Sequence, residues 1–331
     1  MRKVPARLVR KVPRLNNLLQ RKIELEIENA QLQLDTTRKA KEIRALKKEL
    51  SEARKWAFVP HDHFYSPIPN IDEIKKREAK IWGPRKATVA NIDLNESGQV
   101  KLVRDLKKYY LEQPFSDEKN KKRRFYFVND FYRYADGLIL YSMIRNFKPR
   151  RIIEIGSGFS SAVCLDTNEL FFNNKIACTF IDPYPQVVNK LIRKNDKQAN
   201  TFIKNDLQDL DPKIFTKLGI NDILLIDSTH VAKTASDVNY IFFEILPRLN
   251  PGVLIHFHDI FYPFEYPKEW VFGGHGWNEA YVLRAFLQNN QDYEIVFYTN
   301  FMKTFHKKLM SENLPLFNKD DGASIWLRKK A

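Results

Sequence analysis

A unit made of a short apolar segment, a loop and a helical stretch recurs after Pro149, and it restricts the fold more than any other feature. Five apolar segments begin these units: Arg151–Ile155, Ala177–Ile181, Thr201–Ile203, Ile223–Ile226 and 253–257. Strands that alternate with helices are typical of a doubly wound parallel sheet. Two later strands, Tyr293–Tyr298 and 323–328, are joined by a loop and are expected to pair antiparallel at one sheet edge.

The length of the chain predicts one enzyme-sized domain with an appendage, because 331 residues exceed what one such core needs. We divide the chain into a basic, coiled-coil-like helical arm (1–58), an extension that forms a lid over the active site (59–125) and the sheet domain (126–331). The prolines, aromatics and histidines of 59–70 predict an ordered loop. The basic residues 119–124 are expected to form a surface loop.

The positive charge of the chain is concentrated in the arm. The whole chain carries a net charge of +15, and residues 1–58 hold 16 lysines and arginines against 7 acidic residues. Residues 1–22 contain eight basic residues and no acid. Such a segment is expected to attract a peripheral anionic surface by non-specific electrostatics. A solvated tail without a partner is the alternative.

The arm also carries a seven-residue apolar repeat without proline or glycine from residue 15 to residue 53. One row contains Leu18, Leu25, Leu32, Leu46 and Ala53, interrupted by Lys39; the other contains Leu15, Ile43 and Leu50, interrupted by Lys22, Asn29 and Thr36. This pattern predicts a helix that pairs as a short coiled coil or packs along its own sheet domain. We favour a homo-oligomer or a partner helix, with Asn29 fixing the register.

The cysteine content and the absence of long apolar runs predict a cytoplasmic protein. Cys164 and Cys178 lie in apolar stretches and give neither a disulfide framework nor a zinc-binding spacing. No apolar run approaches the roughly 20 residues that span a bilayer.

The first strand of the sheet domain ends in a glycine turn that leads into a helix. Gly156 and Gly158 permit a tight turn and a close approach of ligand to backbone. Ser161 stands where a dinucleotide fingerprint has its third glycine, which argues against a nicotinamide cofactor. Glu154, near the end of a buried strand, requires a partner. The ammonium group of S-adenosylmethionine is one candidate, directly or through water.

Acidic and amide side chains follow the next two strands. Asp182 comes about 26 residues after the turn, close to the spacing at which an acid binds ribose hydroxyls. Gln208 and Asp209 follow the third strand and are expected to contact an adenine edge, or else to cap a helix. Together these residues predict a nucleoside site.

The fourth and fifth strands deliver two carboxylates and two imidazoles to the carboxyl edge of the sheet. Asp227 and His230 follow the fourth strand, and His258 and Asp259 follow the fifth. His230 is the candidate general base, because an imidazole takes a proton at neutral pH. Asp227 and Asp259, with His258, are candidate ligands of a divalent cation. In the metal-free alternative Asp227 orients His230.

These segments together resemble the class I S-adenosylmethionine-dependent methyltransferases, and more closely the branch associated with sugar and polysaccharide biosynthesis. The similar segments are 63–69, 154–161, 227–231, 256–262 and 277–281. The resemblance implies a Rossmann-like α/β fold whose seven-stranded sheet has an antiparallel last strand. It implies binding of the cofactor's methionine end at Glu154, Gly156 and Gly158, of ribose at Asp182 and of adenine near Gln208. Ser157, Asp209 and Asp227 complete the expected cofactor residues.

Metal-dependent relatives of this kind use an aspartate at the fourth strand, an acidic pair at the fifth and a histidine base. Asp227, Asp259 and His230 match that arrangement, whereas His258 replaces the first acid of the pair. Imidazole suits Zn, Fe or Ni better than Mg, so the substitution leaves the identity of the cation open.

The leading hypothesis is therefore O-methylation of a hydroxyl, on a sugar or polysaccharide. The aromatic residues Tyr65, Tyr134, Trp270 and Trp277 are candidates for stacking on a sugar. Asn129 and Asp136 are expected either to contact the cofactor or to act as caps. A nucleic-acid methyltransferase is disfavoured because 227–230 replaces the proline-flanked tetrapeptide of amine methylation. A non-enzymatic coiled-coil adaptor is disfavoured by the intact acids and His230.

Overall fold

Seven strands hydrogen-bond into one sheet in the order β3-β2-β1-β4-β5-β7-β6. The strands are β1 (Arg151–Ile155), β2 (Ala177–Ile181), β3 (Thr201–Ile203), β4 (Ile223–Ile226), β5 (Leu254–His258), β6 (Tyr293–Tyr298) and β7 (Ser324–Lys329). The first five strands pair in parallel, and β7 lies antiparallel between β5 and β6. The expected Rossmann-like seven-stranded sheet with its last strand antiparallel is confirmed.

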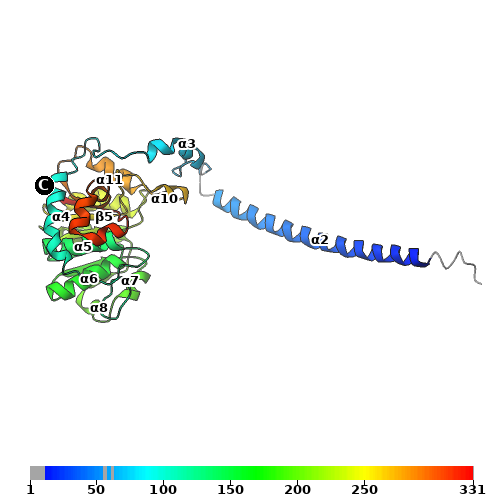
Figure 1. Cartoon of the computed structure of the whole chain (residues 1–331), viewed down its shortest axis with the longest axis horizontal. Helices are drawn as coiled ribbons and strands as arrows, with labels where there is room; N and C mark the ends of the chain where they lie inside the picture. The colour runs from blue at the N-terminus through cyan, green and yellow to red at the C-terminus, as the bar shows by residue number, and fades with distance from the viewer. Residues whose placement is uncertain (1–11, 55–57, 61–62, 331) are drawn as a thin grey trace, which may run out of the picture. The chain divides into compact units, whose positions relative to one another are not determined.

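This computed structural model describes residues 12–54, 58–60 and 63–330. The longer α-helices are α2 (Val12–Arg54), α3 (Ile71–Ile81), α4 (Glu96–Tyr110), α5 (Tyr134–Phe147), α6 (Phe159–Phe172) and α11 (Glu279–Leu287) (Figure 1). The shorter ones are α7 (Gln186–Leu191), α8 (Asp196–Ala199), α9 (Asp237–Tyr240), α10 (Lys268–Phe272), α12 (Thr299–Phe305) and α13 (Lys307–Asn313). Residues 1–75 and residues 76–331 form two separate units.

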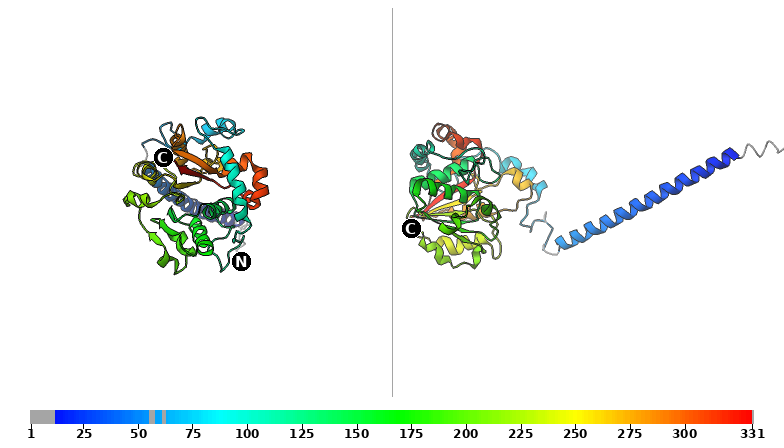
Figure 2. Two further views of the ribbon diagram at one scale, coloured as in Figure 1. Left: turned by 90° about the vertical axis from the view of Figure 1, so that its left-hand side faces the viewer. Right: turned by 90° about the horizontal axis from the view of Figure 1, so that it is seen from below.

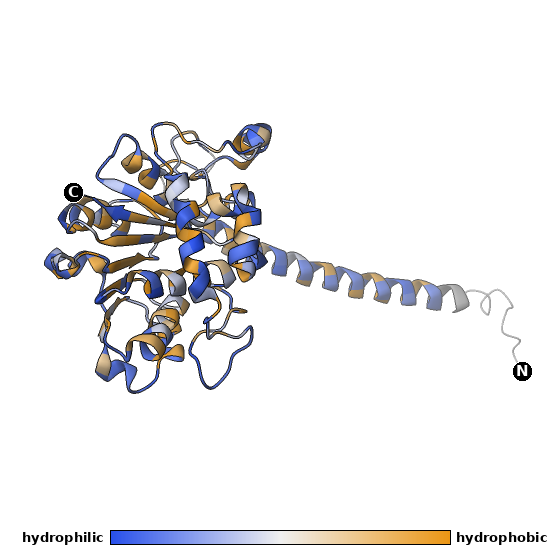
Figure 3. Ribbon diagram, turned by 60° about the vertical axis from the view of Figure 1, so that its left-hand side comes forward, coloured by the Kyte–Doolittle hydropathy of each residue, from blue (hydrophilic) through white to orange (hydrophobic). Residues whose placement is uncertain are grey.

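Helices cover both faces of the sheet (Figure 2). On one face α5 packs against α4 and α6. On the other, Phe242 contacts Phe257 of β5 and Phe286 of α11. The strands are mainly apolar (Figure 3), and every residue of β4 and β5 is buried. Strands buried on both faces are expected in a parallel sheet that carries helices on either side.

The connection between β6 and β7 differs from the sequence-based expectation. A loop was expected there, but the segment forms the helices α12 and α13. Phe301, Met302 and Met310 of these helices are buried. Their burial stabilises two short helices whose apolar pattern is too brief to be recognised alone.

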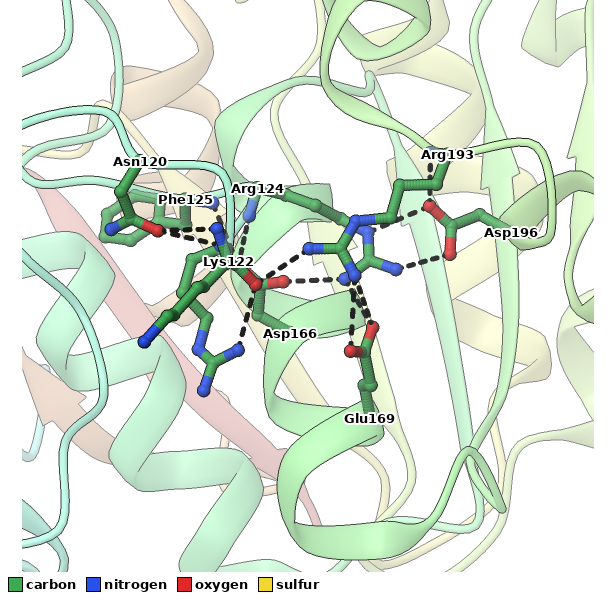
Figure 4. A network of polar contacts seen from close by, with 9 residues as sticks. Asn120, Lys122, Arg124, Phe125, Asp166, Glu169, Arg193 and Asp196 are labelled. Carbon is green, nitrogen blue, oxygen red and sulfur yellow. Dashed lines mark hydrogen bonds and ion pairs between the residues drawn. The ribbon is translucent and has the colours of Figure 1, made fainter.

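The segment before α5 is fixed to α6 by a buried ionic network (Figure 4). Residues 119–124 were expected to form a surface loop, and Lys119 and Lys121 are indeed exposed. The Arg124 guanidinium is buried instead. It lies 2.6 Å from a carboxylate oxygen of Asp166 on α6 and 2.6 Å from one of Asp196 on α8. The backbone nitrogens of residues 124 and 125 also donate to Asp166.

In the 1–75 unit, α2 is a single helix of 43 residues. Its leucines and isoleucines between residues 18 and 50 are exposed. None of the helices in the described part of the chain is both long enough and apolar enough to cross a membrane.

Candidate active site

The turn from β1 into α6 brings the backbone of β1 against the end of β4. Gly156 has a φ of +77°, and a Cβ atom added there would lie 1.7 Å from the carbonyl oxygen of Asp227. Glycine is therefore required at 156 both for its conformation and for space. A Cβ at Gly158 would meet only Val187, at 3.7 Å. The space above Gly158 is open because it belongs to the adjoining cavity.

This cavity has a volume of about 480 Å³ and lies at the carboxyl ends of the parallel strands. The expected cofactor residues that line it are Gly156, Ser157, Gly158, Asp182, Gln208 and Asp227. Glu154 and Asp209 are not among its lining residues. Asp206, Phe131 and Tyr132 also line the cavity, and they were not included in the predicted set.

Asp182 is held in a fixed orientation at the tip of β2. Its Oδ2 accepts hydrogen bonds of 2.9 Å from the backbone nitrogen and from the hydroxyl of Ser157. Its Oδ1 accepts a bond of 2.7 Å from the backbone nitrogen of Tyr184. A carboxylate oriented by three donors is suited to receive the hydroxyls of a ligand.

Glu154 lies fully buried beneath the turn. The Ser161 hydroxyl donates to its Oε2 at 2.5 Å and accepts from the Gly158 nitrogen at 3.1 Å. The Oε1 atom has no hydrogen-bond partner among the described residues. Burial raises the pKa of Glu154 to about 8. Ser161, which replaces the third glycine of a dinucleotide motif, thus anchors the acid. The unpaired Oε1 is itself buried beneath the turn, and Glu154 does not line the cavity.

His230 lies among three carboxylates, two of them at the ends of β4 and β5 and one at the start of α11. Its Nε2 is 3.4 Å from Asp227 and 3.7 Å from Asp259, and its Nδ1 is 2.8 Å from Oε2 of Glu279. Burial lowers the pKa of His230, but Asp227 and Glu279 outweigh it and raise the pKa to about 10. Without a ligand the imidazole therefore carries two protons at neutral pH.

Glu279 was missed as a site residue by the sequence-based prediction. It is the first residue of α11, its side chain is 1% exposed, and burial raises its pKa. The segment 277–281 was recognised as part of the family resemblance, which was the available signal. Its contact with His230 depends on packing between segments 49 residues apart.

Comparison with known proteins agrees with this geometry. A family profile described as a methyltransferase domain matches residues 153–260, from β1 to just beyond Asp259. An uncharacterised protein of Archaeoglobus fulgidus is 38% identical over 170 residues, which are 50% of this chain and 75% of that protein. The chain belongs to this methyltransferase-domain family. The seven-stranded sheet is accordingly that of a class I methyltransferase.

Similar solved structures include the O-methyltransferase TomG of Streptomyces achromogenes. It is 12% identical with a TM-score of 0.39, over 78% of this chain and 96% of that one. A methyltransferase of Podospora anserina is 13% identical with a TM-score of 0.38, over 83% of this chain and 99% of that one. Because both scores lie under 0.5, the family assignment rests on the profile and the archaeal relative.

Three donors of the methyltransferase domain are close enough to share a metal ion. Asp227, His230 and Asp259 each offer one ligand atom, all within 4.8 Å of one another. The metal ligands predicted from the sequence were Asp227, Asp259 and His258, whereas the structure brings His230 to the two aspartates. His258 Nε2 is 3.6 Å from Asp259, but its ring packs against Tyr132, with 5.0 Å between centroids. Two oxygens and one imidazole form a donor set for a divalent cation.

Aromatic side chains stand beside His230 in the methyltransferase domain. The Trp277 ring lies 4.4 Å from the imidazole, between centroids, and Trp270 contacts Trp277 edge-on at 5.2 Å. Both tryptophans are partly exposed. Tyr134 is buried and stacks on Phe127 instead.

Asn129 and Asp136 serve the fold of the methyltransferase domain. The Asn129 amide group bonds the backbone of the turn at Phe131 and Tyr132. Asp136 accepts bonds from the Ala323 nitrogen and the Ser324 hydroxyl, at the start of β7. The sequence left open whether these residues contact the cofactor or act as caps, and the contacts seen here correspond to the structural role.

Proposed function

We propose that this chain is an O-methyltransferase that uses S-adenosylmethionine to methylate a hydroxyl group of a sugar or polysaccharide. One observation carries the proposal. Asp227 lines the cavity and its Oδ1 lies 3.4 Å from Nε2 of His230. The candidate cofactor site and the candidate base thus share one wall.

The residues around the cavity fit the parts of S-adenosylmethionine. Asp182, already oriented by Ser157, would bind the ribose hydroxyls, and Asp206 with Gln208 would contact the adenine. The unpaired oxygen of Glu154, which is buried beneath the cavity's glycine turn, would bind the ammonium group through water. The bound cofactor supplies an electrophilic methyl group.

His230 would take the proton that a hydroxyl loses when its oxygen is methylated. Glu279 holds the ring through Nδ1, which leaves Nε2 directed toward the carboxylates of Asp227 and Asp259. The Glu279 carboxylate also stabilises the imidazolium that forms, as in other acid-histidine pairs. A positively charged ligand near Asp227 would offset that carboxylate, lower the pKa of His230 and so free Nε2 to act as a base.

A divalent cation would be held by Asp227, His230 and Asp259 and would lower the pKa of an acceptor hydroxyl. That role uses the Nε2 atom that a base needs, so the two roles exclude each other. Methyl transfer to a hydroxyl needs a proton acceptor, whereas a cation is optional. We therefore assign Nε2 to the proton.

The sugar acceptor is supported by the aromatic wall and by the family resemblance. The partly exposed rings of Trp277 and Trp270 offer an apolar surface next to His230. Such rings stack on the apolar faces of ring-shaped ligands while polar neighbours bind their hydroxyls.

Calorimetric titration of the full chain with S-adenosylmethionine tests the cofactor. Asp182→Ala is expected to weaken binding at least tenfold. Asp209→Ala is the matched control, because this neighbouring acid lies outside the cavity, and its affinity should equal that of the wild type. Absence of binding by the wild-type chain would refute the proposal.

Transfer is tested with radiolabelled S-adenosylmethionine against sugar nucleotides, oligosaccharides and RNA. Label is expected in a carbohydrate fraction. His230→Ala should keep cofactor affinity and reduce turnover by about 10² to 10⁴, the range of general acid-base catalysis. Label found in RNA alone would show that the acceptor is a nucleic acid and not a carbohydrate. Unchanged turnover of His230→Ala would show that His230 is not the base.

A further inference from the structure

The helix α2 carries a row of apolar side chains, interrupted by four polar residues, that is exposed within the 1–75 unit. Six of them have 49 to 68% of their surface exposed: Leu18, Leu25, Leu32, Ile43, Leu46 and Leu50. Helices in proteins are stabilised mostly by packing of an apolar face, and this row of α2 has no such packing within the 1–75 unit. A second helix laid along this row would bury it.

The spacing of the row assigns each residue a coiled-coil position. Positions d are Leu18, Leu25, Leu32, Lys39 and Leu46, and positions a are Lys22, Asn29, Thr36, Ile43 and Leu50. Leucine at d is favoured in parallel two-stranded coiled coils. A single asparagine or lysine at position a disfavours larger bundles and fixes the register, because each polar group then faces its equivalent. Asn29 is such a residue, whereas Lys22 and Lys39 each face an identical charge of the second copy, which lowers the stability of the pair.

The charges that flank the row complement those of a second copy in one orientation. In a parallel, in-register pair, Arg21 at position g faces Glu26 of the second copy, and Glu42 faces Lys47. Glu28 faces Gln33 and Asp35 faces Ala40, so no like charges meet at these flanking positions.

The antiparallel arrangement has less of this complementarity. When the two apolar rows are aligned in opposite directions, Glu28 faces Glu42 of the other copy and Asp35 faces its own equivalent. Arg21 faces Glu49, so the two copies form three like-charge pairs and two opposite-charge pairs at these positions. Facing like charges destabilise a coiled coil and disfavour that orientation. The charge pattern therefore distinguishes the two orientations.

We propose that α2 pairs with α2 of a second copy of this chain as a parallel, in-register, two-stranded coiled coil. The two N-terminal segments then start from the same end of the coil. Residues 1–22 carry eight basic residues and no acid, and the pairing doubles that charge in one place. Two linked basic segments bind an anionic surface with greater avidity than one. The dimer does not depend on the proposed methyl transfer.

A second apolar group on α2 supplies the matched control. Ile27 and Leu34 are each 65% exposed and occupy position f, opposite the row. Lys41 and Lys48 take that position in the following turns, so the group ends at Leu34. These two residues have the same chemistry as the row but lie outside the proposed interface.

Sedimentation equilibrium of the full chain tests the pairing. The wild type is expected to be a dimer at about 10 µM. The double variant Leu25→Asp/Leu32→Asp should be monomeric, whereas Ile27→Asp/Leu34→Asp should stay dimeric. The thermal transition of the sheet domain should be the same in all three chains. A monomeric wild type at 100 µM, a trimer, or equal behaviour of the two double variants would overturn the proposal.

Cysteine cross-linking tests the orientation. Cys164 and Cys178 are buried, so an introduced cysteine is the reactive one. Asn29→Cys should form an intermolecular disulfide under mild oxidation, and Lys41→Cys at position f should not. An antiparallel pair would give no disulfide at 29 but would link Lys22→Cys of one copy to Leu46→Cys of the other. That result would overturn the parallel register.

Discussion

Oε2 of Glu279 lies 2.8 Å from Nδ1 of His230, and both side chains are almost fully buried. This bond joins the start of α11 to the loop after β4. It fixes the imidazole so that Nε2 faces the carboxylates of Asp227 and Asp259. Glu279 thereby positions His230 and also sets its affinity for a proton.

Removing the charge of Glu279 should shift the pH dependence of methyl transfer. In Glu279→Gln the ring keeps a hydrogen-bond partner but loses a carboxylate that raises the pKa of His230. The pKa should fall, so the acidic limb of the pH-rate profile should move to lower pH. The maximal rate should fall about 10- to 100-fold, because the imidazolium is less stabilised.

The measurement is turnover against pH at saturating cofactor, with calorimetry to show that cofactor affinity is unchanged. Asp237 is a matched acid, since it lies in the same region but bonds Thr229 rather than His230. Asp237→Asn should leave the acidic limb where it is in the wild type. An unmoved limb in Glu279→Gln would show that His230 is not the titrating base.

The affinity for S-adenosylmethionine should depend on pH through Glu154. Burial raises the pKa of this acid to about 8, so it is protonated at pH 6 in the free protein. An ammonium group binds the carboxylate form, so binding releases a proton below pH 8. Affinity should rise with pH, by at most roughly tenfold per unit, and level off above pH 8.

Calorimetry across this pH range, in buffers of different ionisation enthalpy, measures both the affinity and the proton released. The Glu154→Gln side chain cannot titrate. The affinity of this variant for S-adenosylmethionine should therefore be lower than that of the wild type at pH 8 and should not change between pH 6 and pH 8. A wild-type affinity that is also flat would separate Glu154 from the cofactor.

The buried network of Arg124 should contribute strongly to stability. Arg124→Met leaves the carboxylates of Asp166 and Asp196 without their cation (Figure 4). Breaking a buried ion pair by removing one partner costs about 3–5 kcal/mol. Denaturant unfolding should show a loss of this size. Arg123→Met, at the adjacent and more exposed position, should change the free energy of unfolding by less than about 1 kcal/mol.

The sequence predicted the elements whose pattern is local. β1 to β4 and β6 match their predicted bounds, because each forms a short, mainly apolar run between turn or loop residues. The strand ends likewise placed Asp182, Asp227 and His230 at one edge of the sheet.

Features that arise from packing between distant segments were not predictable in this way. Glu279 approaches His230 because the start of α11 hydrogen-bonds to the loop after β4, and no spacing in the sequence records that contact. His258 and His230 look equivalent in sequence, yet only His230 joins Asp227 and Asp259 within 4.8 Å. The burial of Arg124 likewise depends on acids 42 and 72 residues further along the chain.

Metal ions should distinguish the two roles open to Nε2 of His230. If this atom takes the proton, turnover should persist in excess chelator. Added Zn²⁺ should then inhibit, because imidazole and two carboxylates bind it and block Nε2. Asp259→Asn removes one ligand but leaves His230 and Glu279 in contact, so it should weaken zinc inhibition more than it lowers turnover. Loss of turnover in chelator, restored by a divalent cation, would instead make Asp227, His230 and Asp259 a metal centre and require another group to accept the proton.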